Sequence, residues 1–212
     1  MSKSTDRREE LSVFAIIGVL VAAAVLVVFV PPLFSQPTQG AETMDEAVDI
    51  AQDFLVLTGD KDLAIDRVVE FRNGFYVAYY ERSTGIGAFE MQIDKPGALR
   101  MMWIQGLYDI RPEQGPNMMW NTKYGQMMGW SSGVVFKGAV IEADQAKGYA
   151  QGYVDSHLAG AKVLEIRPFY GYYTVDVGMD GKTYGMLSVN AYTGQIWYHV
   201  WNGEYIDTRS FG

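Results

Sequence analysis

The chain has 212 residues, a formal net charge of −8 and no cysteine, and 49% of its residues are hydrophobic. This hydrophobic share is enough to build a folded core, which disfavours an intrinsically disordered chain. The lack of cysteine excludes disulfide scaffolds, thiolate zinc sites and cysteine nucleophiles. The acidic charge disfavours nucleic acid and anionic lipid surfaces as partners.

The N-terminal region contains a long uncharged segment. Residues 1–10 form a short polar head, and Leu11–Val30 carries no charge before a Pro-Pro pair. A helix of twenty apolar residues spans about 30 Å, the thickness of a bilayer core, and proline then ends it. We therefore predict a transmembrane helix within 11–34, followed by a linker over 35–42. A cleaved signal peptide, the alternative, has a shorter apolar region and a small-residue cleavage site.

Basic residues predict the orientation of this helix. Lys3, Arg7 and Arg8 precede the apolar segment, whereas the first basic residue after it is Lys61. Because basic residues are retained on the cytoplasmic side, the N-terminus is expected in the cytoplasm. Residues 35–212 are then extracytoplasmic, and the protein crosses the cell membrane once.

Two segments of similar pattern follow, over 43–103 and 141–212. Each begins with small and aromatic residues at helical spacing, 99 positions apart: Ala47, Ala51 and Phe54, then Ala146, Ala150 and Tyr153. Thr43 and Glu46 have the spacing of a capping box at the start of the first helix. About four strands are predicted after each helix. The segments therefore predict an α+β fold, two repeats of one helix packed on a roughly four-stranded antiparallel sheet.

Turn signals separate the predicted strands. Asn73-Gly74 and Asp180-Gly181 are typical of two-residue hairpins, so the strands on either side of each are expected to pair antiparallel. The last strand of the first repeat is expected over 98–103 and that of the second over 195–201. Many strand residues are aromatic, Trp197 among them. Consecutive aromatic residues in a strand point to opposite faces, so some are expected on an outer face.

The order of these elements resembles the PepSY domain, a module shared by protease propeptides and a regulator of spore-cortex lysis. The pattern Glu46-Ala47-x3-Ala51 and the closing turn Asn190–Ile196 carry the resemblance. The first repeat has a shorter turn, Ile93–Gly97, without the threonine. The chain also resembles membrane-anchored proteins with a GPNMMWNTKYG segment, here Gly115–Gly125. The PepSY resemblance implies binding, inhibition or regulation of partner proteins, and no catalytic residues.

The connector over 104–140 and the residues just before it are rich in methionine. Six methionines lie within 28 residues: Met101, Met102, Met118, Met119, Met127 and Met128. Thioethers select Cu(I), which makes Met118, Met119, Met127 and Met128 a candidate copper site, to which His157 or His199 could add a ligand. Methionine also fills irregular gaps in cores. As a third alternative, these methionines with Trp120, Tyr124 and Trp130 form a partner surface.

The sequence offers little to an enzyme. Gly129–Gly133 matches G-x-S-x-G, but the strand, helix and α/β sheet that this motif needs are not predicted around it. Asp180–Thr183 resembles the end of a phosphate loop and is better explained as a hairpin tip. Glu70 and Glu165 occupy similar places in the two repeats, which fits either an acid–base pair or simple repetition. No catalytic or cofactor-binding residue is predicted.

These patterns together predict a membrane-anchored extracytoplasmic binding or regulatory module. Its expected partner is another protein of the membrane or envelope, on which the chain docks as an accessory subunit. Copper handling through the methionine-rich connector is the alternative, and a hydrolase is the third possibility.

Overall fold

The computed structural model describes residues 40–96, 110–125 and 140–212. Within them lie three helices, α2 (Met44–Thr58), α3 (Asn117–Trp120) and α4 (Ala143–His157). The strands before α4 are β1 (Leu63–Phe71), β2 (Gly74–Glu81), β3 (Gly87–Asp94) and β4 (Ile110–Pro112). Those after it are β5 (Ala161–Phe169), β6 (Tyr172–Met179), β7 (Lys182–Asn190), β8 (Ile196–Tyr198) and β9 (Tyr205–Ser210).

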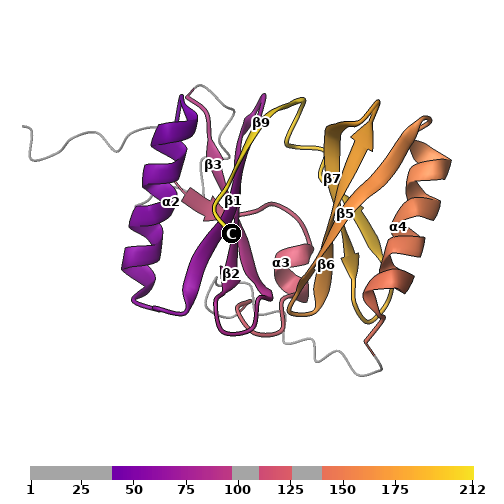
Figure 1. The fold of residues 1–212 in the computed structure, drawn as a ribbon, viewed down its shortest axis with the longest axis horizontal. Helices are drawn as coiled ribbons and strands as arrows, with labels where there is room; N and C mark the ends of the chain where they lie inside the picture. The colour runs from indigo at the N-terminus through magenta and orange to yellow at the C-terminus, as the bar shows by residue number, and fades with distance from the viewer. Residues whose placement is uncertain (1–39, 97–109, 126–139) are drawn as a thin grey trace, which may run out of the picture. The chain divides into compact units, whose positions relative to one another are not determined.

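The nine described strands form one mixed sheet in the order β8-β7-β6-β5-β3-β2-β1-β9, with β4 paired to β3. Only the β3–β5 pair is parallel among them, and it has a single paired position, Gly87 with Phe169. Helices α2 and α4 lie on opposite outer sides of the strands (Figure 1). The predicted α+β class is thereby confirmed.

The predicted membrane segment, residues 11–34, lies outside the described residues, as does the strand expected over 98–103. No helix in the described ranges is both long enough and apolar enough to cross a bilayer. The anchor and its orientation therefore stay predictions.

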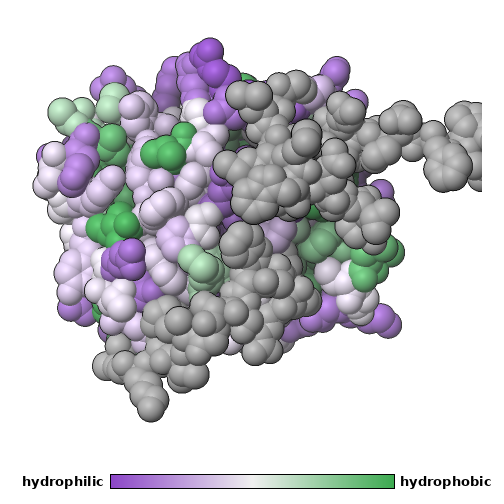
Figure 2. Space-filling view, turned by 180° about the vertical axis from the view of Figure 1, so that it is seen from behind, coloured by the Kyte–Doolittle hydropathy of each residue, from purple (hydrophilic) through white to green (hydrophobic). Residues whose placement is uncertain are grey.

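Buried apolar side chains form three groups. One lies between α2 and β1–β4, and a second lies between α4 and β5–β8. The third contains residues of both halves and none of α2 or α4: Val69, Phe71, Tyr76, Ala78, Trp120, Phe169, Tyr172 and Met186. On the face that Figure 2 shows, the hydrophobic residues outside the grey ones appear as small separate patches among hydrophilic ones. Because the third group has residues of both halves and none of α2 or α4, it joins the faces of the strands that these helices leave uncovered.

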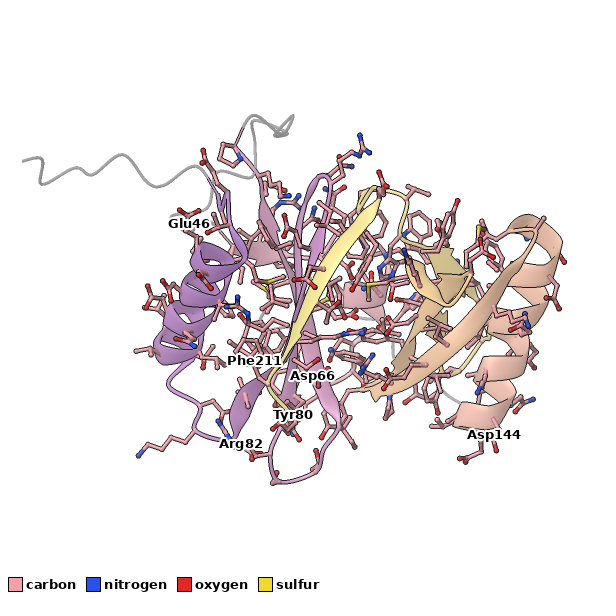
Figure 3. All side chains as sticks on the ribbon, turned by 45° about the horizontal axis from the view of Figure 1, so that its top comes forward. Glu46, Asp66, Tyr80, Arg82, Asp144 and Phe211 are labelled. Atoms are coloured by element: carbon pink, nitrogen blue, oxygen red, sulfur yellow. The ribbon has the colours of Figure 1, made fainter. Side chains whose placement is uncertain are left out.

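Repeat one, defined here as α2 with β1–β4, matches repeat two (α4, β5–β8) element by element, although β4 lies within the connector over 104–140. β1 and β5 both have nine residues, β2 and β6 both have eight, and each pair starts 98 positions apart (63 and 161, 74 and 172). β1 and β5 even share a bulge at the same place, at Asp66 and Leu164. Glu46 and Asp144, near the helix starts, lie at opposite ends of the view, so α2 and α4 run in opposite directions (Figure 3).

The two helices reach their sheets through small residues. Ala47 and Ala51 of α2, and Ala146 and Ala150 of α4, are fully buried, which lets each helix approach the strands closely. Phe54 and Tyr153 pack beside them and are partly buried. The predicted capping box is present, since Thr43 Oγ1 accepts a bond from Glu46 N–H and the Glu46 carboxylate accepts one from Thr43 N–H.

One predicted turn is confirmed and another is displaced by one residue. Asp180 and Gly181 both have positive φ, 51° and 77°, as a two-residue hairpin turn of type I′ requires. In repeat one, Phe71 pairs with Gly74, so the turn consists of Arg72 and Asn73 and Gly74 belongs to β2. Gly74 lies against the carbonyl oxygen of Ile93, where a Cβ would stand at 2.5 Å. The glycine is thus required for close strand approach rather than for the turn.

The final strand corrects the expected extent of the second repeat. Residues 205–210 were expected to belong to it, but β9 pairs antiparallel with β1 of repeat one, from Arg67 opposite Ser210 to Phe71 opposite Tyr205. The two paired strands lie far apart in the sequence, and no local sequence pattern predicts their pairing. Among the described residues, repeat one therefore carries a fifth strand with no counterpart in repeat two.

Candidate functional site

Polar side chains are buried where the two repeats meet. We call them the interrepeat polar cluster: Arg67, Tyr76, Glu90, Glu113, Asn117, Thr174, Asp176, Ser188 and His199. They come from β1, β2, β3, β6, β7, α3 and the residues just after β4 and β8. Burying so many polar groups is costly unless they bond to one another, so their contacts decide what the cluster can do.

Glu90 lies at the centre of the cluster. Its Oε1 accepts hydrogen bonds from Tyr76 Oη and, at 2.5 Å, from Thr174 Oγ1 of repeat two. Asn117 Nδ2 lies 2.8 Å from Glu90 Oε2 and 2.8 Å from Glu113 Oε2, so one amide bridges two carboxyl groups. Burial raises the pKa of Glu90, and the neighbouring Glu113 raises it further.

Glu113 and His199 occupy equivalent positions and meet across the interface. Glu113 follows β4 directly, His199 follows β8 directly, and each donates its N–H to the third strand of its repeat, at Glu90 O and Met186 O. His199 Nδ1 lies 2.9 Å from Glu113 Oε1, and His199 Nε2 lies 2.9 Å from Ser188 Oγ. Burial by itself would lower the pKa of His199, but the surrounding carboxylates, Glu113 foremost with Glu90 and Asp176, together outweigh it and raise the pKa.

The three side chains Ser188, His199 and Glu113 contact one another in the order of a serine–histidine–acid triad. Its exposed fractions are 0%, 3% and 1%, respectively. Ser188 also lies within β7, paired with Thr174 of β6 on one side and Trp197 of β8 on the other. A substrate cannot reach Ser188 Oγ in this conformation. We therefore interpret the three side chains as a bridge between the repeats and not as a catalytic triad with Ser188 as its nucleophile.

Arg67 and Asp176 of the cluster also belong to an ionic network that includes Arg167 and Asp66 beside it. Arg67 of β1 donates to both carboxylate oxygens of Asp176 on β6, at 2.5 and 2.9 Å. Arg167 of β5 adds a bond of 2.9 Å to the same carboxylate and lies 3.4 Å from Asp66 of β1. Burial would raise the pKa of Asp176, but the two guanidinium groups lower it. These four residues tie the repeats together by charge.

The predicted partner-surface residues of the connector are interior. Trp120 is 5% exposed and belongs to the apolar group between the repeats, and Tyr124 is buried beside Phe89. This corrects the expectation that they face outward, whereas Trp130 lies outside the described residues. Burial follows because α3 and the turn after it fill the space between the repeats.

The turn after α3, which contains Lys123 and Tyr124, is hydrogen-bonded to Glu81 at the end of β2. Tyr170 Oη donates to its carboxylate at 2.5 Å and Thr84 Oγ1 at 3.0 Å, and Lys123 and Tyr124 also donate to it. Burial alone would raise the pKa of Glu81, but these hydrogen bonds, with that from Lys123 foremost, lower it to about 2. Much of the segment Gly115–Gly125 thus connects the repeats.

The candidate copper ligands are only partly described. Met118 is fully buried in the core of repeat one, whereas 40% of the neighbouring Met119 is exposed. Met101, Met102, Met127 and Met128 lie outside the described residues. Across the part of the chain that the structure describes, no group of three His, Asp or Glu side chains could hold a metal ion. The copper hypothesis stays a prediction.

The other sequence candidates are scattered. Glu70 bonds Lys95 at 2.5 Å, and Glu165 bonds Arg167 at 2.6 Å. With the 98-residue offset of the strands, Glu70 matches Pro168 rather than Glu165, so the two acids are not equivalent. The exposed His157 contacts Tyr153 O, Asp180–Thr183 is a hairpin tip, and Gly129–Gly133 lies outside the described residues.

Sequence reasoning missed most of the cluster, although a signal for it exists. Thr174 and Asp176 alternate with apolar residues along β6, and Glu90 and Gln92 do so along β3. Such alternation is typical of a strand with one solvated face, so the pattern alone does not indicate a buried cluster. Only the packing of the two repeats reveals that this face is buried.

Comparison with known proteins gives little. No protein-family model matches the chain, and no curated protein matches it. Among solved structures, it is similar to the Bacillus megaterium YpeB C-terminal domain, with a TM-score of 0.36 and 14% identity over 78% of this chain and 69% of that one. At this level the likeness carries no argument about function, and the PepSY resemblance stays a prediction.

Proposed function

We propose that this protein is a non-enzymatic binding module, anchored in the cell membrane by residues 11–34, that docks on another membrane or envelope protein. The observation that carries the proposal is the contrast between its interior and its edge. The reactive side chains of the interrepeat polar cluster are closed inside and bonded to one another, whereas large apolar side chains are exposed at a sheet edge.

That edge surface consists of the exposed Trp197 and Val200 with the partly buried Trp201, and we call it the β8 edge surface. β8 is the terminal strand of the sheet order. Trp197 is well exposed, Val200 is 74% exposed, and the rings of Trp197 and Trp201 lie 6.3 Å apart. Tryptophan is enriched at the centres of protein interfaces, where it supplies much of the binding energy.

Docking is tested with a matched pair of surface variants of the full chain. Val200→Ser changes the β8 edge surface, while Val56→Ser makes the same change at the end of α2, where Val56 is 79% exposed. Both sites are exposed, so neither change should alter folding. Quantitative mass spectrometry of proteins cross-linked in native membranes should show one partner reduced severalfold by Val200→Ser and unchanged by Val56→Ser. Equal recovery with all variants would contradict docking at this edge.

Anchoring is tested separately. Leu20→Arg places a charge at the middle of the predicted helix, which costs about 2.5–3.5 kcal/mol on insertion scales, so membrane association should fall. Protease added outside intact spheroplasts should digest residues 35–212 of the wild type. Protection of that region would overturn the proposed orientation.

A further inference from the structure

The two repeats are joined through a narrow backbone connection. β3 and β5 share one paired position, Gly87 with Phe169. Each repeat has its own helix and its own apolar core. The third apolar group and the interrepeat polar cluster hold them face to face, together with the bonds around Glu81 and the Arg167–Asp66 pair. The polar cluster is the part of this interface whose charge can change.

The ion pair of Glu113 and His199 lies inside this interface. Both side chains are fully buried, so their charges are compensated mainly by each other. The other ionisable groups near His199 are Glu90 of β3, Asp176 of β6 with its partner Arg67 of β1, and the phenols of Tyr76 and Tyr172. Asn117 and Ser188 supply uncharged bonds. The acids Glu90, Glu113 and Asp176 thus surround His199.

We propose that Glu113 and His199, with Glu90, form a proton-dependent latch that holds the two repeats together when His199 is protonated and releases them when it loses its proton. With neutral His199, the Glu113 carboxylate would keep the Asn117 amide and an imidazole N–H at Nδ1 beside it, but no positive charge would face it. An uncompensated buried charge is strongly unfavourable, and separation of the repeats returns it to water.

The direction of the pH effect follows from the raised pKa values. His199 has a pKa above its ordinary 6.5, so its contribution is complete below about pH 6.5 and disappears as the pH rises through the higher folded value. Glu90, whose pKa is also raised, acts in the same direction. Alkaline pH therefore opens the latch and mildly acidic pH closes it. For each proton released on opening, the open-to-closed ratio rises by up to about tenfold per pH unit.

The experiment uses the full chain in lipid nanodiscs. Because the protein has no cysteine, spin labels can be placed at Gln52→Cys on α2 and Lys147→Cys on α4, both exposed positions. Inter-label distances are measured from about pH 6 to about pH 9, the range in which a histidine with a raised pKa titrates. We expect one distance at the acidic end and a second, longer distance that grows with pH.

One variant of the latch and one control variant test whether the pH dependence comes from Glu113 and His199. Glu113→Gln removes the charge and should reduce the pH slope of the longer population at least twofold. Glu204→Gln makes the same change in an exposed ion pair with Arg72 and should leave the slope unchanged. The histidine signals of the wild type give an independent readout, because the chain has only two histidines and His157 is exposed. A distance that does not change with pH, or a slope equal in Glu113→Gln and wild type, would overturn the latch.

Discussion

After its fourth strand, repeat one presents Glu113, while repeat two presents His199 at the equivalent position, and the two side chains meet at 2.9 Å. The second strands differ as well, since Ala78 in the third apolar group matches Asp176, whose carboxylate binds Arg67, at the 98-residue offset. Identical residues at such facing positions would place like charges together or leave polar atoms unpaired. The comparison teaches that two copies of one backbone can pack face to face when their facing residues have become different.

The open edges of the two repeats differ as well. β9 pairs along β1, whereas in the ranges that the structure describes β5 pairs on the corresponding side at Phe169 alone. Repeat two has Pro168 where repeat one has Glu70, and proline has no N–H to donate to a neighbouring strand. The chemistry of one residue thus helps decide which repeat takes the C-terminal strand.

The largest effect should come from making repeat two resemble repeat one at Asp176. Asp176→Ala introduces the residue found at Ala78 and leaves Arg67 buried without its carboxylate. We expect a loss of about 3–5 kcal/mol in the free energy of unfolding. Chemical denaturation measures it. Glu204→Ala, which breaks an exposed ion pair, should cost less than about 1 kcal/mol; a similar loss in both variants would contradict the buried network.

Acid should weaken the bonds around Glu81, which has Met179 as its equivalent in repeat two. The pKa of Glu81 is lowered to about 2. The folded protein therefore gains about 3 kcal/mol from Glu81 at pH values above the ordinary pKa of 4.5, and this gain is lost as the pH falls towards 2. Chemical denaturation from about pH 4.5 downward should show a larger loss of stability in the wild type than in Glu81→Gln. An equal loss in both would argue against it.

The equivalent aromatic positions on the helices sharpen the comparison of the two cores. Phe54 contacts the rings of Tyr79 and Phe89, whereas Tyr153 stacks on the exposed His157 and on Tyr198. Because both are only partly buried, we expect about 2–3 kcal/mol for Phe54→Ala and about 1–2 kcal/mol for Tyr153→Ala. Thermal unfolding of the two variants measures the difference. The reverse order would show that α4 is the better packed helix.

The smallest effect concerns the helix starts. Thr43 caps α2 through its side chain, while Glu142 at the start of α4 makes no side-chain cap bond. Thr43→Ala should cost about 0.5–2 kcal/mol, and Glu142→Thr should add a few tenths to about 1 kcal/mol. Denaturation midpoints report both changes. No gain from Glu142→Thr would mean that the start of α4 cannot adopt the capping geometry.

Local features could be predicted from the sequence because local chemistry determines them. The capping box at Thr43, the buried alanines of both helices, the Asp180-Gly181 hairpin and the helix-then-strands order of each repeat depend on residues close together in the chain. Backbone propensity, capping and side-chain periodicity act over a few residues, so their pattern is readable without the fold.

Contacts between distant segments were decided by the tertiary structure alone. The pairing of β9 with β1, the burial of Trp120 and Tyr124, and the meeting of Glu113 with His199 bring together segments that no short pattern links. A strand face with alternating polar residues has the same sequence whether it faces water or another sheet. Only the packing of the second repeat removed the water and turned those residues into a buried, charge-coupled cluster.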